Sequence, residues 1–297
     1  MQGALGAAAA ASLPHSFAAG SIELTPVAPE LSLLTGAGGN VLALTTDEGL
    51  VLVDSGAAAA SGALLDALGT LPGSGRVRTL FNTHWHLEQI GGNEPIGTAG
   101  ATIVAHEKTR LRLATGYYLP AEDRYQQPVP ARAQPTESFY TTGTTTVGGH
   151  PIDYGYLLEA HTDGDCYVHF RNANVIAVGD AVSPLRDPTL DWFGGGWLGG
   201  RVDSLQLLLT LGNERTKFFP SYGPAIGRAE VQAEHDLLLK LFERFVELVR
   251  KGESAEDILA AGVMNDTGRT WQDPLEFVRT AHKGLWAHHN TLSPDVV

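Results

Sequence analysis

The sequence predicts a single α/β domain built from two strand-rich halves with helices on the outside. Three observations support this fold class. Strand-like runs alternate with short helical patterns along the 297-residue chain, and no low-complexity linker divides it. The 35 glycines and 16 prolines favour many tight turns over one long helical bundle. Hydrophobic residues make up 43% of the chain, which is enough to form a core.

The first half is expected to contain four strands and two helices, because short apolar runs predict strands and apolar residues at helical spacing predict helices. The expected strands are 42–45, 50–53, 77–82 and 101–105, and the expected helices are 61–68 and 107–115. The first two strands should pair around the turn 46–49. Residues 116–138 contain four prolines and are expected to form an extended surface excursion.

The second half repeats the pattern and ends in helices. Its expected strands are 144–147, 152–159, 166–170, 175–178 and 217–219. Its expected helices are 204–211, a long amphipathic helix at 228–250, and a mostly helical tract from residue 254 onward.

The overall charge excludes some classes of function. The chain has 33 acidic and 20 basic side chains, a formal net charge of −13. Binding to nucleic acid or to anionic lipid needs a basic surface, so neither is expected. The single cysteine, Cys166, rules out an intrachain disulfide and a cysteine-cluster metal site. A small-molecule partner remains the expected one.

Residues 1–18 have the pattern of an export signal. Residues 3–13 form an apolar run that is too short to span a bilayer, and a small residue at 16 and another at 18 suit cleavage after Ala18. The basic segment that usually precedes such a run is missing, which leaves a disordered alanine-rich tail as the alternative. We expect an exported, periplasmic protein whose mature domain, 19–297, does not insert into a membrane.

The candidate chemistry lies in residues 83–89, Thr-His-Trp-His-Leu-Glu-Gln. Two histidines two residues apart, directly after an apolar strand, can point the same way at its end. Neutral imidazole is a common ligand of zinc and related metals. Glu88 and Gln89 add oxygen donors at the same corner of the chain.

The sequence around these histidines resembles the metallo-β-lactamase superfamily. Residues 82–93, Asn-Thr-His-Trp-His-Leu-Glu-Gln-Ile-Gly-Gly-Asn, are similar to its signature T-H-x-H-x-D-H-x-G-G-N. Further similar segments follow the family's order at 51–56, 103–107, 159–165, 178–181 and 219–224. The resemblance implies a four-layer αββα sandwich with a metal site in a cleft along one edge of the two sheets.

The resemblance also implies roles for individual residues. His84, His86 and His161 match the histidines that hold one metal ion, and Asp180 matches the aspartate that bridges two. Occupied by zinc, such a site would activate a bound water and polarise a substrate carbonyl. Glu88 is then a candidate general base and Tyr222 a candidate hydrogen-bond donor to a developing oxyanion. The candidate catalytic residues are thus Glu88, Asp180 and Tyr222, and the candidate metal ligands are the three histidines and Asp180.

This sequence departs from the family where a second metal ion would bind. The positions are Glu88, Gln89 and Tyr222, where the family has aspartate and two histidines. An amide is a weak neutral ligand, and a phenol must lose a proton to bind well. We therefore expect one Zn²⁺, held by the three histidines and Asp180, with Glu88 and Gln89 as further candidate ligands.

Other residues have simpler expected roles. Asp54 and Asp165 should orient the metal histidines as hydrogen-bond acceptors. His106 should cap a helix, His169 should be structural, and His150 and the pair at 288–289 should lie at the surface. Trp192, Phe193 and Trp197 flank a glycine-rich loop that would either wall an apolar pocket or pack as a unit.

Two functions remain open from the sequence. One is a metal-dependent hydrolase that acts on an ester, lactone, thioester or amide. The other is a non-catalytic exported protein that keeps the sandwich and binds a small molecule or a partner. The three histidines favour the hydrolase, whereas the replacements at Gln89 and Tyr222 favour the binding protein.

Overall fold

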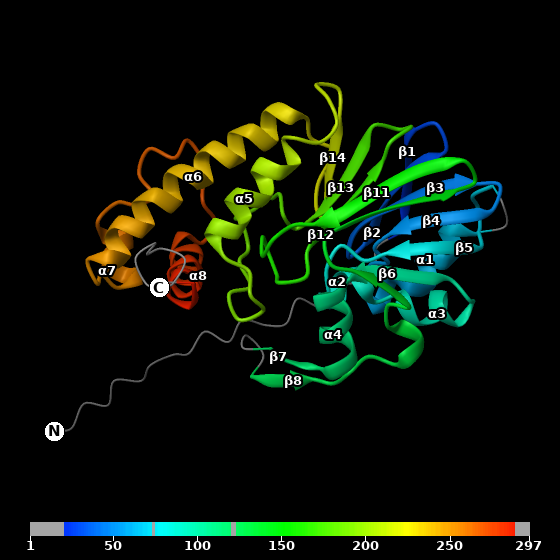
Figure 1. Cartoon of the computed structure of the whole chain (residues 1–297), viewed down its shortest axis with the longest axis horizontal. Helices are drawn as coiled ribbons and strands as arrows, with labels where there is room; N and C mark the ends of the chain where they lie inside the picture. The colour runs from blue at the N-terminus through cyan, green and yellow to red at the C-terminus, as the bar shows by residue number, and fades with distance from the viewer. Residues whose placement is uncertain (1–20, 73–74, 120–122, 289–297) are drawn as a thin grey trace.

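The computed structural model describes residues 21–72, 75–119 and 123–288. Two main β-sheets pack face to face, and helices cover their outer faces (Figure 1). This is the αββα sandwich that the sequence predicted. The export signal expected at 1–18 lies outside the described residues. Within the described part of the chain, every helix is too short or too polar to cross a bilayer.

The first sheet has seven strands in the order β1-β2-β3-β4-β5-β6-β9. Strands β1 to β4 pair antiparallel, and β4, β5, β6 and β9 pair parallel. Their bounds are β1 Glu23–Ala28, β2 Leu31–Ala37, β3 Gly39–Thr46, β4 Gly49–Val53, β5 Val77–Phe81, β6 Thr102–His106 and β9 Glu137–Phe139.

The second sheet has five strands in the order β10-β11-β12-β13-β14, of which only the last pair is parallel. Their bounds are β10 Thr142–Val147, β11 His150–Tyr156, β12 Cys166–Phe170, β13 Val175–Gly179 and β14 Lys217–Pro220. A separate hairpin, β7 Tyr117–Leu119 with β8 Arg124–Gln126, lies beside α4 (Figure 1).

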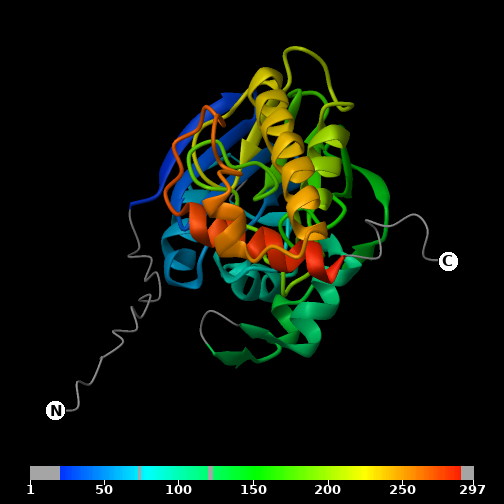
Figure 2. The same ribbon diagram turned by 90° about the vertical axis from the view of Figure 1, so that its left-hand side faces the viewer.

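Helices flank each sheet. On the side of the first sheet lie η1 Ala58–Ala60, α1 Ser61–Leu68, α2 Leu87–Ile90, α3 Asn93–Thr98, α4 Glu107–Thr115 and η3 Ala131–Ala133. On the side of the second lie α5 Leu198–Leu208, α6 Arg228–Arg250, α7 Ala255–Ala260 and α8 Pro274–Ala287. Figure 2 shows α8 crossing below α6, so the C-terminal helices form one layer.

Strand alternation divides the core into three apolar layers. In β4, Val51 and Val53 face the second sheet, whereas Leu50 and Leu52 face α1. A third layer lies between the second sheet and the C-terminal helices, where Phe245 of α6 is fully buried. Both sheets are therefore covered on both faces. A polar site can form only where the strands end.

Most predicted elements form within a few residues of their expected bounds. Helices 61–68, 107–115 and 228–250 and strand 166–170 have the predicted bounds. The excursion expected at 116–138 was only partly right, because its end, β9, joins the first sheet. The strands β1 and β2 were not predicted.

Candidate metal centre

The candidate site lies where several strands end at one edge of the sandwich. His84 and His86 follow β5, His161 lies between β11 and β12, and Asp180 directly follows β13. Gly179 ends β13 with a φ of 56°, and a Cβ there would lie 2.8 Å from Oγ1 of Thr83. A glycine is needed at this point because the end of β13 approaches the segment that carries His84.

Three imidazoles meet at this edge. Candidate ligand atoms of His84, His86 and His161 all lie within 4.8 Å of one another. The rings stand edge to face, with centroids 4.8 to 5.0 Å apart. Oδ2 of Asp180 lies 3.6 Å from Nε2 of His84 and 3.9 Å from Nε2 of His161. The structure thus brings together the four residues that the sequence singled out as metal ligands.

Trp85 anchors the bend that carries the first two histidines. Its side chain is buried against Tyr117, with ring centroids 4.4 Å apart. Its Nε1 donates to Oδ1 of Asp163 at 3.2 Å. Its ring also meets the His86 ring edge to face, with centroids 4.5 Å apart, and so helps to hold that imidazole in place.

In each of the three rings, the nitrogen that points away from the other two rings, here called the outer nitrogen, has a partner. Nδ1 of His84 lies 3.0 Å from Oγ1 of Thr83. Nε2 of His86 lies 3.0 Å from Oδ2 of Asp191, and Nδ1 of His161 lies 2.9 Å from the carbonyl oxygen of Thr189. A carbonyl and a carboxylate can only accept, so His161 and His86 donate from these nitrogens. Their other nitrogens then carry lone pairs.

These lone pairs fit a cation. Nε2 of His161 and Nδ1 of His86 face each other at 3.0 Å, and Nε2 of His84 is buried without a hydrogen-bond partner among the described residues. Burial lowers the pKa of His84 well below its usual value and that of His161 to about 4, so both rings stay neutral. Three imidazoles beside a carboxylate are donors of the type that zinc binds. The cluster is compatible with metal binding.

Two buried aspartates accept hydrogen bonds from the segments that carry the histidines. Asp54 accepts from the backbone N–H and the hydroxyl of Thr83, both at 2.8 Å. Asp165 accepts from the backbone N–H groups of His161 and Thr162 and from the Thr162 hydroxyl. Burial raises the pKa of Asp54 to about 8 and that of Asp165 to about 7. The sequence placed both as acceptors that orient histidines, and the structure shows that they act on the backbone and on threonines.

The replaced positions lie beside the histidines. Glu88 and Gln89 are in α2, and the Gln89 side chain is 1% exposed with both amide atoms lacking a partner among the described residues. Tyr222 follows β14 and is half-buried. Burial, with the nearby charges of Asp180 and Glu88, raises its pKa to about 12, so the phenol keeps its proton. A protonated phenol is a hydrogen-bond donor and a poor metal ligand.

Three charged residues at the site were not predicted. Asp191 holds His86, as described above. Arg186 donates to Oδ1 of Asp180 at 2.5 Å, and its guanidinium carbon lies 3.6 Å from the centroid of the Tyr222 ring. The third is Arg201. All three lie in or after an irregular loop, where no motif or spacing marks them.

Arg201 ties the C-terminal helices to the site. It is fully buried in α5, and its guanidinium donates to the carbonyl oxygens of Asp180 at 2.8 Å and Thr189 at 3.3 Å. It also contacts Oε1 of Glu234 in α6 at 3.1 Å. Because the Thr189 carbonyl also holds His161, Arg201 fixes the backbone behind two of the candidate ligands.

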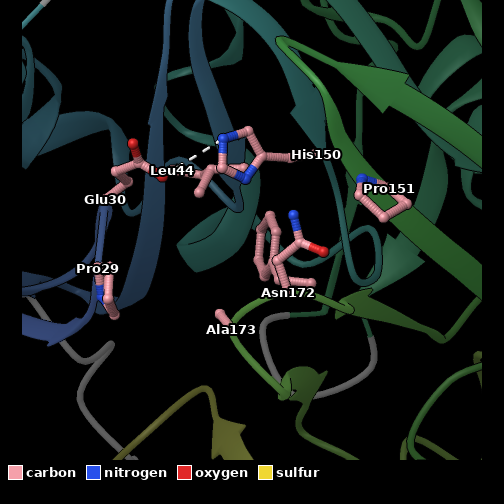
Figure 3. A pocket seen from close by; sticks show the side chains of 8 residues that line it. Pro29, Glu30, Leu44, His150, Pro151, Asn172 and Ala173 are labelled. Carbon is pink, nitrogen blue, oxygen red and sulfur yellow. Dashed lines mark ion pairs between the residues drawn. The ribbon is translucent and has the colours of Figure 1, made fainter.

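The remaining histidines lie away from the cluster. His106 caps α4, as expected, by accepting from the backbone N–H of Lys108. His169 lies within β12, and His288 stacks on Trp197, while residue 289 lies outside the described residues. His150 was expected to be exposed, but it is half-buried. It lines a pocket at the opposite end of the sheets, where its Nε2 lies 3.4 Å from Oε2 of Glu30 (Figure 3).

The aromatic side chains of the loop lie in two different surroundings. Trp197 packs against the C-terminal core and lies 4.5 Å, ring to ring, from His288. Trp192 and Phe193 meet edge to face at 5.6 Å.

Comparisons with known proteins agree with this geometry. Residues 34–219 match the family model of the metallo-beta-lactamase superfamily. No curated protein matches the sequence significantly. A metallo-beta-lactamase from Pontibacter korlensis is 22% identical with a TM-score of 0.59, over 73% of this chain and 99% of that one. DIM-1 metallo-beta-lactamase is 17% identical with a TM-score of 0.60, over 74% and 98%.

A third similar structure extends further along the chain. The sec-alkylsulfatase Pisa1 from Pseudomonas sp. is 15% identical with a TM-score of 0.66, and the match covers 93% of this chain and 52% of the sulfatase. These low identities establish the fold alone. The family match covers most of the chain and includes all three clustered histidines. The chain therefore belongs to the metallo-beta-lactamase superfamily.

Proposed function

We propose that this protein is a metal-dependent hydrolase that acts on an ester, lactone, thioester or amide bond of a small molecule and binds one Zn²⁺. One observation carries the proposal. Three imidazoles, of which those of His84 and His161 are buried, converge on one point, and the partners of the nitrogens on the other side of the rings turn two of the lone pairs toward that point. A zinc ion there would lower the pKa of a bound water toward about 7 and polarise a carbonyl.

The chain's own side chains would serve the rest of the reaction. His84, His86 and His161 would hold the metal, with Oδ2 of Asp180 on the same side. Glu88 would act as the general base, because it lies next to the histidine cluster and its charge acts on His86. Tyr222 would donate from its phenol to the oxygen that gains negative charge as the carbonyl is attacked.

A groove beside Tyr222 supports a small-molecule substrate. It has a volume of about 450 Å³ and is lined by Gly38, Gly39, Tyr222 and Gly223 together with residues of β1 and β2. This volume suits a small organic ligand. Gly39 begins β3 and Tyr222 follows β14, so the groove lies between the ends of the two sheets.

The experiment combines metal analysis with turnover. The protein is purified without chelator, its metal content is measured, and hydrolysis is followed on lactones, esters, thioesters and β-lactams. One equivalent of zinc together with turnover of at least one class supports the proposal. A metal-free protein that regains neither zinc nor activity in added Zn²⁺ contradicts it.

The second candidate is a non-catalytic small-molecule or partner-binding protein. It is favoured by Gln89 and Tyr222, which stand at α2 and after β14 in place of two imidazoles. Bound zinc without turnover on the whole panel, together with saturable binding of a panel compound, would support this alternative.

We also propose that residues 1–18 direct export to the periplasm. The apolar run and the small residues described above support this proposal. Expression in a Gram-negative host, followed by cell fractionation and N-terminal sequencing, tests this. A cytoplasmic product that still begins at residue 1 would contradict it.

A further inference from the structure

The two carboxylate oxygens of Asp180 face different cations. Oδ2 faces Nε2 of His84 and of His161, where the metal ion is proposed. Oδ1 pairs with the guanidinium of Arg186 at 2.5 Å. Asp180 is almost fully buried, so both of these contacts form largely out of water.

Arg186 lies among oxygen donors. Its guanidinium packs over the Tyr222 ring at 3.6 Å, and Tyr222 in turn is close enough to Asp180 and Glu88 for both charges to affect it. The buried amide of Gln89 lies behind the groove that Tyr222 lines, since a Cβ on Gly39 of that groove would lie 3.3 Å from Nε2 of Gln89. Neither polar atom of that amide has a hydrogen-bond partner among the described residues.

Arg186 balances one of the negative charges near His86. The carboxylates that act on His86 are Asp191, Glu88 and Asp180. One divalent metal ion and one guanidinium neutralise these three charges. A second divalent ion beside Arg186 would leave an excess of positive charge in a mostly buried site, which is unfavourable.

Arg186 is positioned by the fold. Arg269 donates to the carbonyl oxygens of Arg186 and Ser183. Oδ2 of Asp187 accepts from the backbone N–H groups of Gln272 and Asp273 at 2.9 and 2.8 Å. The segment 269–273 therefore holds the loop 183–187 from its outer side and keeps Arg186 over Tyr222.

We propose that Arg186 is the resident cation on the far side of Asp180, and that it limits the centre to one metal ion by excluding a second one from the oxygen donors of Asp180, Glu88 and Gln89. This inference rests on the proposed metal-dependent function. Loss of the guanidinium would leave an uncompensated negative charge among oxygen donors, which suit Mn²⁺ as well as Zn²⁺.

The test counts metal ions and needs no substrate. Wild type, Arg186→Ala and Arg186→Gln are stripped with chelator, checked for folding by circular dichroism, and titrated with Zn²⁺ and with Mn²⁺. Metal content after dialysis and the Mn²⁺ electron paramagnetic resonance spectrum give the stoichiometry. We expect one equivalent of zinc in the wild type and two metal equivalents in both variants, with the second at least tenfold tighter than any second site of the wild type.

Two control variants separate the loss of positive charge at residue 186 from the general effect of replacing an arginine. Arg186→Lys keeps the positive charge and should bind one equivalent. Arg279→Ala removes an arginine that pairs with Glu256 on the surface, and it should also bind one.

The outcomes distinguish the two proposals. One equivalent in Arg186→Ala and Arg186→Gln overturns the role of Arg186 and leaves the metal centre intact. Two equivalents in the wild type also overturn that role. No metal in the wild type overturns both the metal centre and this inference.

Discussion

The carboxylate of Asp191 lies 3.0 Å from Nε2 of His86 and fixes which nitrogen of that ring points at the cluster. This contact also raises the pKa of His86, despite its burial, and lowers that of Asp191. A charged acceptor behind a metal histidine increases the basicity of the ligand atom. Asp191 therefore belongs to the proposed metal centre, although it does not face the metal position.

Asp191→Asn should weaken zinc binding by about 10- to 100-fold, because the neutral amide no longer supports the donated proton of His86. Competition with a chromophoric chelator measures the affinity. Asp153→Asn is the matched control, since its carboxylate pairs with Arg171 on the second sheet, and its zinc affinity should equal that of the wild type. Unchanged affinity in Asp191→Asn would remove Asp191 from the centre.

His84→Ala and His161→Ala should each lose the metal ion, whereas His169→Ala should keep it. The first two remove rings of the cluster, and His169 lies within β12 outside it. Metal content after dialysis decides the result. Equal loss in all three variants would show that the ligands are assigned wrongly.

A chelator should destabilise the wild type and leave His161→Ala unaffected. A ligand that binds only the folded state, present at about 1,000 times its Kd, adds about 4 kcal/mol to the free energy of unfolding. Thermal melts with and without EDTA measure this difference. An equal EDTA effect on both proteins would mean that the stabilising ion binds elsewhere.

Tyr222→Phe should keep the fold and the metal ion but slow hydrolysis about 100- to 1000-fold, the usual effect of removing one oxyanion donor. Because burial and nearby carboxylates raise the pKa of Tyr222 to about 12, the phenol is protonated at both pH 7 and pH 9. The loss should therefore be the same at the two pH values in steady-state assays. Unchanged turnover would leave Glu88 and the metal ion to carry the reaction.

The buried pair Arg201–Glu234 should be sensitive to removal of one partner. Arg201→Met leaves the Glu234 carboxylate buried without its cation, which costs about 3–5 kcal/mol of stability. Adding Glu234→Gln should recover part of this loss, because it removes the unpaired charge. Urea unfolding measures each variant. A control at the exposed pair Arg279–Glu256 should change stability by about 1 kcal/mol or less.

Elements with strong local patterns could be predicted from the sequence. The amphipathic helix α6 has the predicted bounds, since its apolar face repeats at helical spacing over 23 residues. The start of α5 at Leu198 was missed, because Gly199 and Gly200 have the pattern of a loop. A Cβ on Gly200 would lie 2.6 Å from the carbonyl oxygens of Leu158 and Glu159, so tertiary packing requires glycine inside this helix.

The residues of the candidate site also divide into those that the sequence could predict and those that it could not. His84 and His86 were found because their spacing after a strand is local, and His161 and Asp180 because their segments resemble the family. Arg186, Asp191 and Arg201 could not be found, because each acquires its role from contacts with residues that are distant in the sequence or that a loop brings near. A lone charged residue in a loop has no periodicity that distinguishes it from a solvated one.

The family match ends at residue 219, yet the molecule has no natural boundary there. Glu234 and Arg269 lie beyond that point and hold the loop that carries Arg186, and Phe245 shares one core with Ile176 of the second sheet. A gene shortened to the matched region would retain every candidate ligand and lose the residues that support them. The C-terminal helices are therefore part of the architecture of the candidate metal centre.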